Sequence, residues 1–161
     1  FTYKLNHSII KKRFHMNILL AASKTESDSG LSLLILRITI ATVFMAHGSQ
    51  KLFSWFGGYG LEGTGQWMES IGLAPGYLMA LLAGSGEFFG GLLLLFGLLT
   101  RASSLVLAIT MFVAIFSVHF ANGFFMSANG YEFAFVLLGA SVALMFSGAG
   151  KYSLDALLLN K

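Results

Sequence analysis

The sequence predicts an all-α integral membrane protein: a bundle of four transmembrane helices, with a short interfacial helix in the first long connection. Of its 161 residues, 56% are hydrophobic and 11% are charged, and the mean hydropathy is +0.76. Soluble domains carry about 25% charged residues. This composition therefore indicates a chain embedded in lipid, and its length suits one domain of a few helices.

Several function classes are excluded by residues and motifs that the sequence lacks. It contains no cysteine, which excludes disulfides, thiolate zinc sites and Cys-ligated iron–sulfur clusters. It has no Walker A loop, dinucleotide-binding glycine motif or H-E-x-x-H motif, so we expect no nucleotide binding. The net charge of +3 includes bases that precede Met16, where translation is expected to start, so it does not predict nucleic-acid binding.

The chain divides into a polar N-terminal tail (residues 1–30), a membrane domain (31–155) and a C-terminal tail (156–161). The tail carries a basic run followed by NILLAA, a pattern shared with signal peptides. That apolar stretch is short, and a stronger apolar segment follows almost at once. We therefore interpret residues 1–30 as a tail that is partly ordered at best, with a cleaved signal as the alternative. Residues 1–15 are expected to be an upstream extension or processed sequence.

Apolar segments over residues 31–52, 77–99, 102–120 and 132–146 are the predicted spans. The first three approach the ~20 residues that a helix needs to cross the hydrocarbon, and the fourth is shorter. Backbone exposed to lipid must satisfy its own hydrogen bonds, so each segment is predicted to be a helix. The short TRAS sequence at 100–103 predicts a tight turn, which makes the second and third helices antiparallel neighbours.

The connection between the first two spans is long and aromatic. Thr64 is predicted to cap a short helix that bears Trp67 and ends near Gly72. Trp55 and Tyr59 suit the headgroup interface, as does Trp67. We expect this connection to lie across the membrane surface as a lid.

Basic residues predict the orientation. Lys24, Arg101, Lys151 and Lys161 fall on one side of this layout, and Lys51 alone falls on the other. The side richer in Lys and Arg faces the cytoplasm in most membrane proteins. Both termini are therefore predicted to be cytoplasmic, with the two longer connections outside.

Glu87 lies in the middle of an otherwise apolar span. A carboxylate at that depth costs about 2.5–3.5 kcal/mol on insertion scales, so it is a candidate functional group. Its neighbours one turn away are Ala83, Gly84, Gly90 and Gly91. Small residues let another helix approach closely, so Glu87 is predicted to face the interior of the bundle.

Ionisable residues from all four spans are predicted to meet in the outer half of the bundle. His47 and Lys51 share a face near the outer end of the first span, and Arg37 lies near its inner end. The candidate catalytic set is His47, Glu87, His119 and Glu132.

This set fits several kinds of chemistry. His and Glu side chains could hydrogen-bond a quinone and exchange protons with it, relay protons, or bind a small polar or sulfur-containing substrate. They could also ligate a metal ion, although no ligand spacing singles one out. A purely structural role for each residue is the alternative to all of these.

The motifs HGSQK, E-x-x-GG, TR, H-x-x-NG, GYE and YSLD occur in this order between residues 31 and 155. In this order they resemble the DoxX family. One departure is Ala149, where many relatives have proline. The resemblance implies a four-helix protein of the bacterial inner membrane, related to the small membrane subunit of thiosulfate:quinone oxidoreductase.

The resemblance also carries residue roles onto this chain. It adds Arg37, Gln50, Lys51 and Asn122 as candidate substrate-binding residues beside the catalytic set. The predicted structural residues are Gly86, Gly90, Gly91 and Arg101.

The function hypothesis is a membrane subunit of an oxidoreductase system that binds quinone, or a small thiol or sulfur substrate, in the outward half of the bundle. The sequence has no flavin or haem motif, so a protein partner is expected to complete the redox cycle, and membrane lipid surrounds the chain. The alternatives are a structural or anchoring subunit of a larger membrane complex, and a small transporter. The absence of an internal repeat fits poorly with common transporter folds.

Overall fold

The structure is a computed structural model, and it describes residues 29–159. The predictions for the N-terminal tail, including the start at Met16 and the contribution of Lys24 to orientation, lie outside the described residues, as does Lys161. Within the described range every regular element is a helix and there is no strand. The chain is an all-α membrane protein, as predicted.

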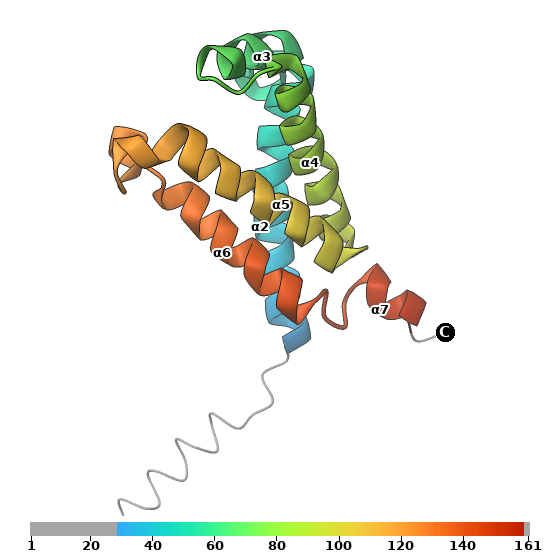
Figure 1. Cartoon of the computed structure of the whole chain (residues 1–161). Helices are drawn as coiled ribbons and strands as arrows, with labels where there is room; N and C mark the ends of the chain where they lie inside the picture. The colour runs from blue at the N-terminus through green and yellow to red at the C-terminus, as the bar shows by residue number, and fades with distance from the viewer. Residues whose placement is uncertain (1–28, 160–161) are drawn as a thin grey trace, which may run out of the picture.

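Four long helices form the bundle and two short ones flank it (Figure 1). The long helices are α2 (Ser29–Phe53), α4 (Gly76–Phe96), α5 (Thr100–Ala114) and α6 (Glu132–Ser147), and the short ones are α3 (Gly60–Ser70) and α7 (Leu154–Leu159). In the part that the structure describes, three stretches are long and apolar enough to cross a membrane, and α6 is a shorter apolar helix. One of the three is α5 with its continuation to Asn122 through a π-helical and a 3-10 turn. The chain is therefore a multi-span membrane protein.

The turn between α4 and α5 lies earlier than the sequence predicted. α4 ends at Phe96, because Gly97 (φ 64°) and Leu99 (φ 49°) adopt the left-handed conformation that stops a helix. Thr100 already belongs to α5, so the prediction that residues 100–103 form the turn is wrong. The reason is a distant cap: the carboxylate of Asp155 accepts hydrogen bonds from the backbone N–H groups of Leu99 (2.8 Å) and Thr100 (3.0 Å).

The short helix α3 begins one turn before its predicted cap. It starts at Gly60, whose φ of 65° changes the chain direction after the preceding loop, so Thr64 lies inside the helix and is buried. The predicted cap at Thr64 is therefore wrong, whereas the predicted end near Gly72 is confirmed. The second half of α3 packs on the first turn of α4, where the backbone N–H of Gly76 donates to the Glu69 carboxylate (2.8 Å).

Glycines bring α2 and α4 into close contact. A Cβ atom at Gly48 would collide with the backbone of Phe88, and one at Gly91 would lie 3.0 Å from the carbonyl oxygen of Ala41. Gly90 packs instead against Leu107 of α5. Small residues permit such close helix packing in lipid, where no hydrophobic effect drives helices together.

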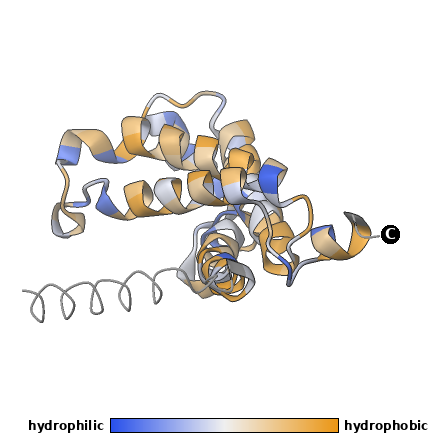
Figure 2. Cartoon of the chain, turned by 90° about the horizontal axis from the view of Figure 1, so that it is seen from below, coloured by the Kyte–Doolittle hydropathy of each residue, from blue (hydrophilic) through white to orange (hydrophobic). Residues whose placement is uncertain are grey.

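The helices α5 and α6 form an antiparallel hairpin that leans across the α2–α4 pair (Figure 1). Hydrophobic residues make up most of the helical ribbon in Figure 2, and large apolar side chains are exposed on each of the four long helices. The buried core where all four long helices meet consists of Ile40, Ala41, Phe44, Leu94, Leu107, Met111, Ile115, Ala134, Leu137 and Leu144. We name the two ends of the bundle after the short helices: the α3 end and the α7 end.

Candidate functional site

Glu87 is buried in the bundle and paired with Lys51. The Lys51 Nζ lies 2.6 Å from the Glu87 Oε2, and the two side chains are 22% and 4% exposed. Glu87 lies halfway along α4, whereas Lys51 lies in the last turn of α2. They meet because α4 extends past the end of α2 at the α3 end, so the terminal turn of one helix faces the middle of the other.

This ion pair places opposite charges inside an apolar environment. Each charge would be costly to bury alone, and the short charge-assisted hydrogen bond offsets part of that cost. Lys51 is the more exposed partner and also donates to the His47 carbonyl oxygen at 3.5 Å. Glu87 is thus a buried acid, and its partner Lys51 approaches it from the edge of the bundle.

His47 lies one turn before Lys51 on α2, and its side chain is exposed. Its ring is 6.0 Å from the ring of Phe133, the second residue of α6. Within residues 29–159 the His47 imidazole makes no hydrogen bond. An imidazole exposed on a membrane-spanning helix is accessible to a ligand dissolved in the bilayer, and His is the side chain best suited to exchange protons near neutral pH.

Gln50 supports the loop that follows α2. Its Nε2 donates to the carbonyl oxygen of Phe56 at 3.2 Å. The backbone of Gly58 packs against Gln50 so closely that a side chain there would collide. The structure therefore gives Gln50 a structural partner beside the ion pair.

His119 and Asn122 lie together at the tip of the α5–α6 hairpin. The His119 Nδ1 lies 2.9 Å from the carbonyl oxygen of Asn129, and Asn122 donates to the same oxygen at 3.2 Å. Glu132 begins α6 with its backbone N–H bonded to the Phe124 carbonyl (2.9 Å), and its carboxylate has no hydrogen bond or ion pair within the described range. The structure thus uses His119 and Asn122 to close the hairpin loop.

The structure brings together part of the predicted set. Glu87 and Lys51 are in contact and His47 adjoins them, whereas His119 and Asn122 form a separate group. Among residues 29–159, no three His, Asp or Glu side chains gather in a way that could hold a metal ion. The described residues thus do not bring His47, Glu87, His119 and Glu132 together around one point, and His119 instead bonds within the hairpin loop.

Arg37 forms a second polar centre at the α7 end. Its side chain is fully buried, its Nη1 donates to the Leu94 carbonyl oxygen at 3.1 Å, and its Nη2 donates to the carbonyl oxygen of Tyr152. Asp155 supplies a nearby negative charge. Arg37 thereby joins α2, the end of α4 and the C-terminal segment.

Asp155 is a residue of this centre that sequence reasoning missed. Burial raises the pKa of Asp155, but hydrogen bonds from Thr100 and Leu99 and the charge of Arg37 outweigh burial, so the pKa lies below its ordinary value. Ser153 completes the segment by accepting from the backbone N–H of Ala156 at 3.1 Å. The signal in the sequence is the acid of the YSLD motif. Arg101, also at this end, is exposed.

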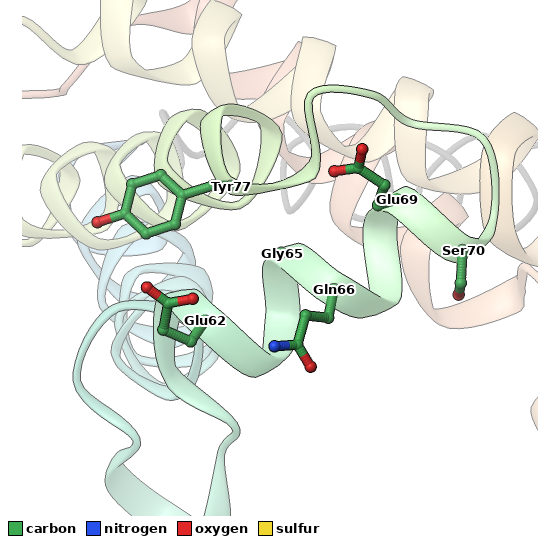
Figure 3. Close-up of a pocket in the computed structure, with 6 residues that line it drawn as sticks. All are labelled: Glu62, Gly65, Gln66, Glu69, Ser70 and Tyr77. Atoms are coloured by element: carbon green, nitrogen blue, oxygen red, sulfur yellow. The ribbon is translucent and has the colours of Figure 1, made fainter.

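An open pocket of about 510 Å³ lies between α3 and the start of α4 (Figure 3). Its lining residues are Glu62, Gly65, Gln66, Glu69, Ser70 and Tyr77. None of them belongs to the predicted site. All of them except the buried Gly65 are exposed at the α3 end, and the Glu69 carboxylate already accepts a hydrogen bond from the first turn of α4.

Comparison with known proteins gives the geometry a family context. The sequence pattern of the DoxX family matches residues 32–120, more than half of the chain. The chain belongs to the DoxX family. The matched region includes Arg37, Lys51 and Glu87 but ends before Glu132 and Asp155.

Relatives from three bacteria match most of their own length. A protein of Haemophilus influenzae, named only as uncharacterized, is 36% identical over 81% of this chain and 85% of its own length. The Escherichia coli inner membrane protein YqjF is 35% identical over 81% of this chain and 95% of its own. The Bacillus subtilis protein named "Putative oxidoreductase CatD" is 36% identical over 76% of this chain and 83% of its own. No solved structure gives a significant match.

Proposed function

We propose that this DoxX-family chain is the membrane subunit of an oxidoreductase system and that it binds a quinone, or a small thiol or sulfur substrate, beside the Lys51–Glu87 pair. The observation that carries the proposal is a buried carboxylate held at 2.6 Å by a lysine, with an exposed imidazole one turn away. Intramembrane ionisable groups of this kind mark substrate and proton pathways. The name of the Bacillus subtilis relative supports a redox role.

In this proposal His47, Glu87 and Lys51 have different roles in the reduction of a quinone. A quinone takes up electrons together with an equal number of protons when it is reduced to a quinol. Reduction takes two electrons and two protons, and for each proton His47 would donate a hydrogen bond to a quinone oxygen and pass its proton to it. Glu87 would then take up a replacement proton from water and return it to His47, and Lys51 would balance the charge of the carboxylate between transfers. The electrons come from an associated redox protein, because the chain has no flavin or haem motif and no cysteine.

The test is quinone reduction by native membranes that contain the whole complex. With thiosulfate or cysteine as the donor and a short-chain ubiquinone analogue as the acceptor, Glu87→Gln should abolish the activity that depends on this chain. Glu62→Gln is the matched control, because Glu62 is an exposed carboxylate on α3. Unchanged activity in Glu87→Gln, at equal abundance of the folded protein, would overturn the assignment of Glu87.

A second candidate, an anchoring subunit without chemistry of its own, is favoured by one observation. Gln50, His119 and Asn122 are all engaged in loop hydrogen bonds. This role predicts that His47→Ala and Glu87→Gln weaken assembly with the partner together. Affinity purification from native membranes in mild detergent distinguishes the roles: the redox proposal predicts that both variants retain the partner.

A further inference from the structure

At the α3 end of the bundle, α2 ends at a different depth from that at which α4 begins. The last turn of α2 lies beside Gly84, where a Cβ atom would come within 2.9 to 3.1 Å of the side chains of Leu52 and Lys51. Gly84 lies two turns inside α4, so α2 stops about 12 Å short of Gly76 at a rise of 1.5 Å per residue. The loop after α2 therefore begins well below the start of α4.

The intervening turns of α4 face outward with leucines. Leu78, Leu81 and Leu82 are exposed, and they continue the apolar outer surface of the helix almost to its first residue. Hydrocarbon is the medium that such a surface requires in a membrane-spanning helix. The end of α2 is thus at a level where lipid tails surround the bundle.

The loop at this level is aromatic and has an unusual backbone. Trp55 is 55% exposed, Phe56 74% and Tyr59 82%. Ser54 (φ 59°) and Phe56 (φ 52°) adopt the left-handed conformation, which is unfavourable for side chains larger than glycine. Non-helical backbone at membrane depth is tolerated where protein or a water-filled cavity surrounds its polar groups, so the hydrogen bonds of this loop decide how deep it can lie.

Two carbonyl groups of the loop backbone have partners within the chain. Gln50 donates from its Nε2 to the Phe56 carbonyl oxygen at 3.2 Å, and the backbone N–H of Gly58 donates to the Trp55 carbonyl oxygen at 3.0 Å. The chain then returns to the start of α4 through α3, where Gly65 packs on the backbone of Gly76. Trp67, two residues after Gly65, therefore lies near the outer boundary of the bundle.

We propose that residues 54–59 form a re-entrant loop that inserts its aromatic side chains among the acyl chains of one leaflet, with Trp55 deeper than Trp67. Its partner is lipid, because the loop is continuous with the leucine surface of α4. Gln50 acts as the internal donor that allows non-helical backbone at this depth. The loop thereby forms a fixed cover over the end of α2 that carries Lys51. This inference does not depend on the proposed redox function.

The experiment uses the intrinsic fluorescence of the chain, which contains two tryptophans. Trp67→Phe leaves Trp55 as the reporter, and Trp55→Phe leaves Trp67. Each full-length variant is reconstituted in phosphatidylcholine vesicles whose acyl chains are brominated near the headgroup, at mid-chain or near the methyl end. Iodide in the buffer reports exposure to water.

For Trp55 we expect quenching to be strongest with mid-chain bromines and weak with iodide. For Trp67 the maximum should shift to bromines near the headgroup, with stronger iodide quenching. Equal depth profiles for the two tryptophans would overturn the proposal. So would protection of Trp55 from both quenchers, which would mean that a second copy of the chain covers the loop.

Gln50→Leu tests the role of the internal donor. With Trp55 as the reporter, loss of the bond to Phe56 should move the bromine maximum toward the headgroup and increase iodide quenching. Gln66→Leu is the matched control, because Gln66 is an exposed glutamine on α3. An unchanged Trp55 profile in Gln50→Leu would contradict the assigned role of Gln50.

Discussion

The bundle buries two charges of opposite sign, and it neutralises them differently. Glu87 contacts its counter-charge directly, and that partner, Lys51, is 22% exposed. Arg37 is fully buried and donates to two backbone carbonyl groups, with Asp155 nearby. A charge held by the fixed backbone of two other segments stabilises the architecture, whereas a charge held by one flexible side chain is suited to exchange partners.

The two centres are also separated by the apolar core. Arg37 and Lys51 lie on the same helix, about 20 Å apart at 1.5 Å per residue. Ile40, Ala41 and Phe44 lie between them on α2 and are buried. We infer that the α7 end serves stability and that the Lys51–Glu87 pair serves chemistry, so substitutions at the two centres should have different consequences.

Arg37→Met should give the largest loss of stability. It removes two charge-assisted hydrogen bonds, each worth about 1.5–3 kcal/mol; the Tyr152 carbonyl group loses its Arg37 donor, and the Leu94 carbonyl group keeps its bond from the Gly97 N–H. Thermal unfolding in detergent, followed by circular dichroism, measures the loss. Arg101→Met is the control, since Arg101 is exposed and should change stability little. Equal effects of the two substitutions would contradict a structural role for Arg37.

Gly48→Ala should separate the two helices that bring Lys51 to Glu87. The new Cβ collides with the backbone of Phe88, and overpacking of this kind costs about 1–3 kcal/mol. Gly139→Ala has no atom within 4 Å of its new Cβ and serves as the control. It should leave stability unchanged or raise it by up to about 1 kcal/mol through helix propensity. If the same unfolding assay found Gly48→Ala more stable than Gly139→Ala, close packing at Gly48 would be disproved.

Asp155→Asn should remove an acid-sensitive part of the stability of the α7 end. The pKa of Asp155 in the folded chain lies below its ordinary value, which is about 3.9 in unfolded chains. Its carboxylate therefore stabilises the fold above that pH, and the contribution is lost as the pH falls through the lowered pKa. Unfolding measured between neutral and acid pH should show that Asp155→Asn loses less stability on acidification than the parent chain does. If stability fell equally with pH in the variant and in the parent chain, a cap on α5 by the Asp155 carboxylate would be contradicted.

Asn122→Ala should have the smallest effect. It removes the two exposed hydrogen bonds that the Asn122 Nδ2 donates to the Val118 and Asn129 carbonyl groups. Each is worth about 0.5 kcal/mol, the low end of the usual range, because water competes for exposed groups. Quinone reduction should be unchanged if Asn122 only closes the hairpin loop. Loss of activity with unchanged unfolding would instead return Asn122 to the substrate site.

The sequence predicted the helices better than the contacts between their ends. Apolar runs determine membrane spans almost directly, so the four helices and the small-residue face around Glu87 were predictable. The pairing of Lys51 with Glu87 depends on how far α4 extends past α2, and no local pattern encodes that offset. The cap supplied by Asp155 joins residues 55 and 56 positions apart, so the start of α5 could not be placed from the TRAS sequence alone.

Candidate residues divided in the same way. Glu87 was identified because a buried charge in lipid is costly wherever it lies. His119 and Asn122 were grouped with it on topology, but a carbonyl group in their own hairpin loop is their closest partner. A polar side chain that hydrogen-bonds within a turn cannot be distinguished in the sequence from one that binds a ligand. The geometry of the loop is needed to separate the two roles.

The most direct test of the division between the two centres is quinone reduction by the double variant Lys51→Met/Glu87→Met, measured per folded molecule in native membranes. Replacing both partners of a buried ion pair with hydrophobic residues of similar volume often leaves stability unchanged or raises it, so the variant should fold and retain its partner. We predict that its quinone reduction is lost. Activity equal to that of the parent chain would contradict a chemical role for the Lys51–Glu87 pair.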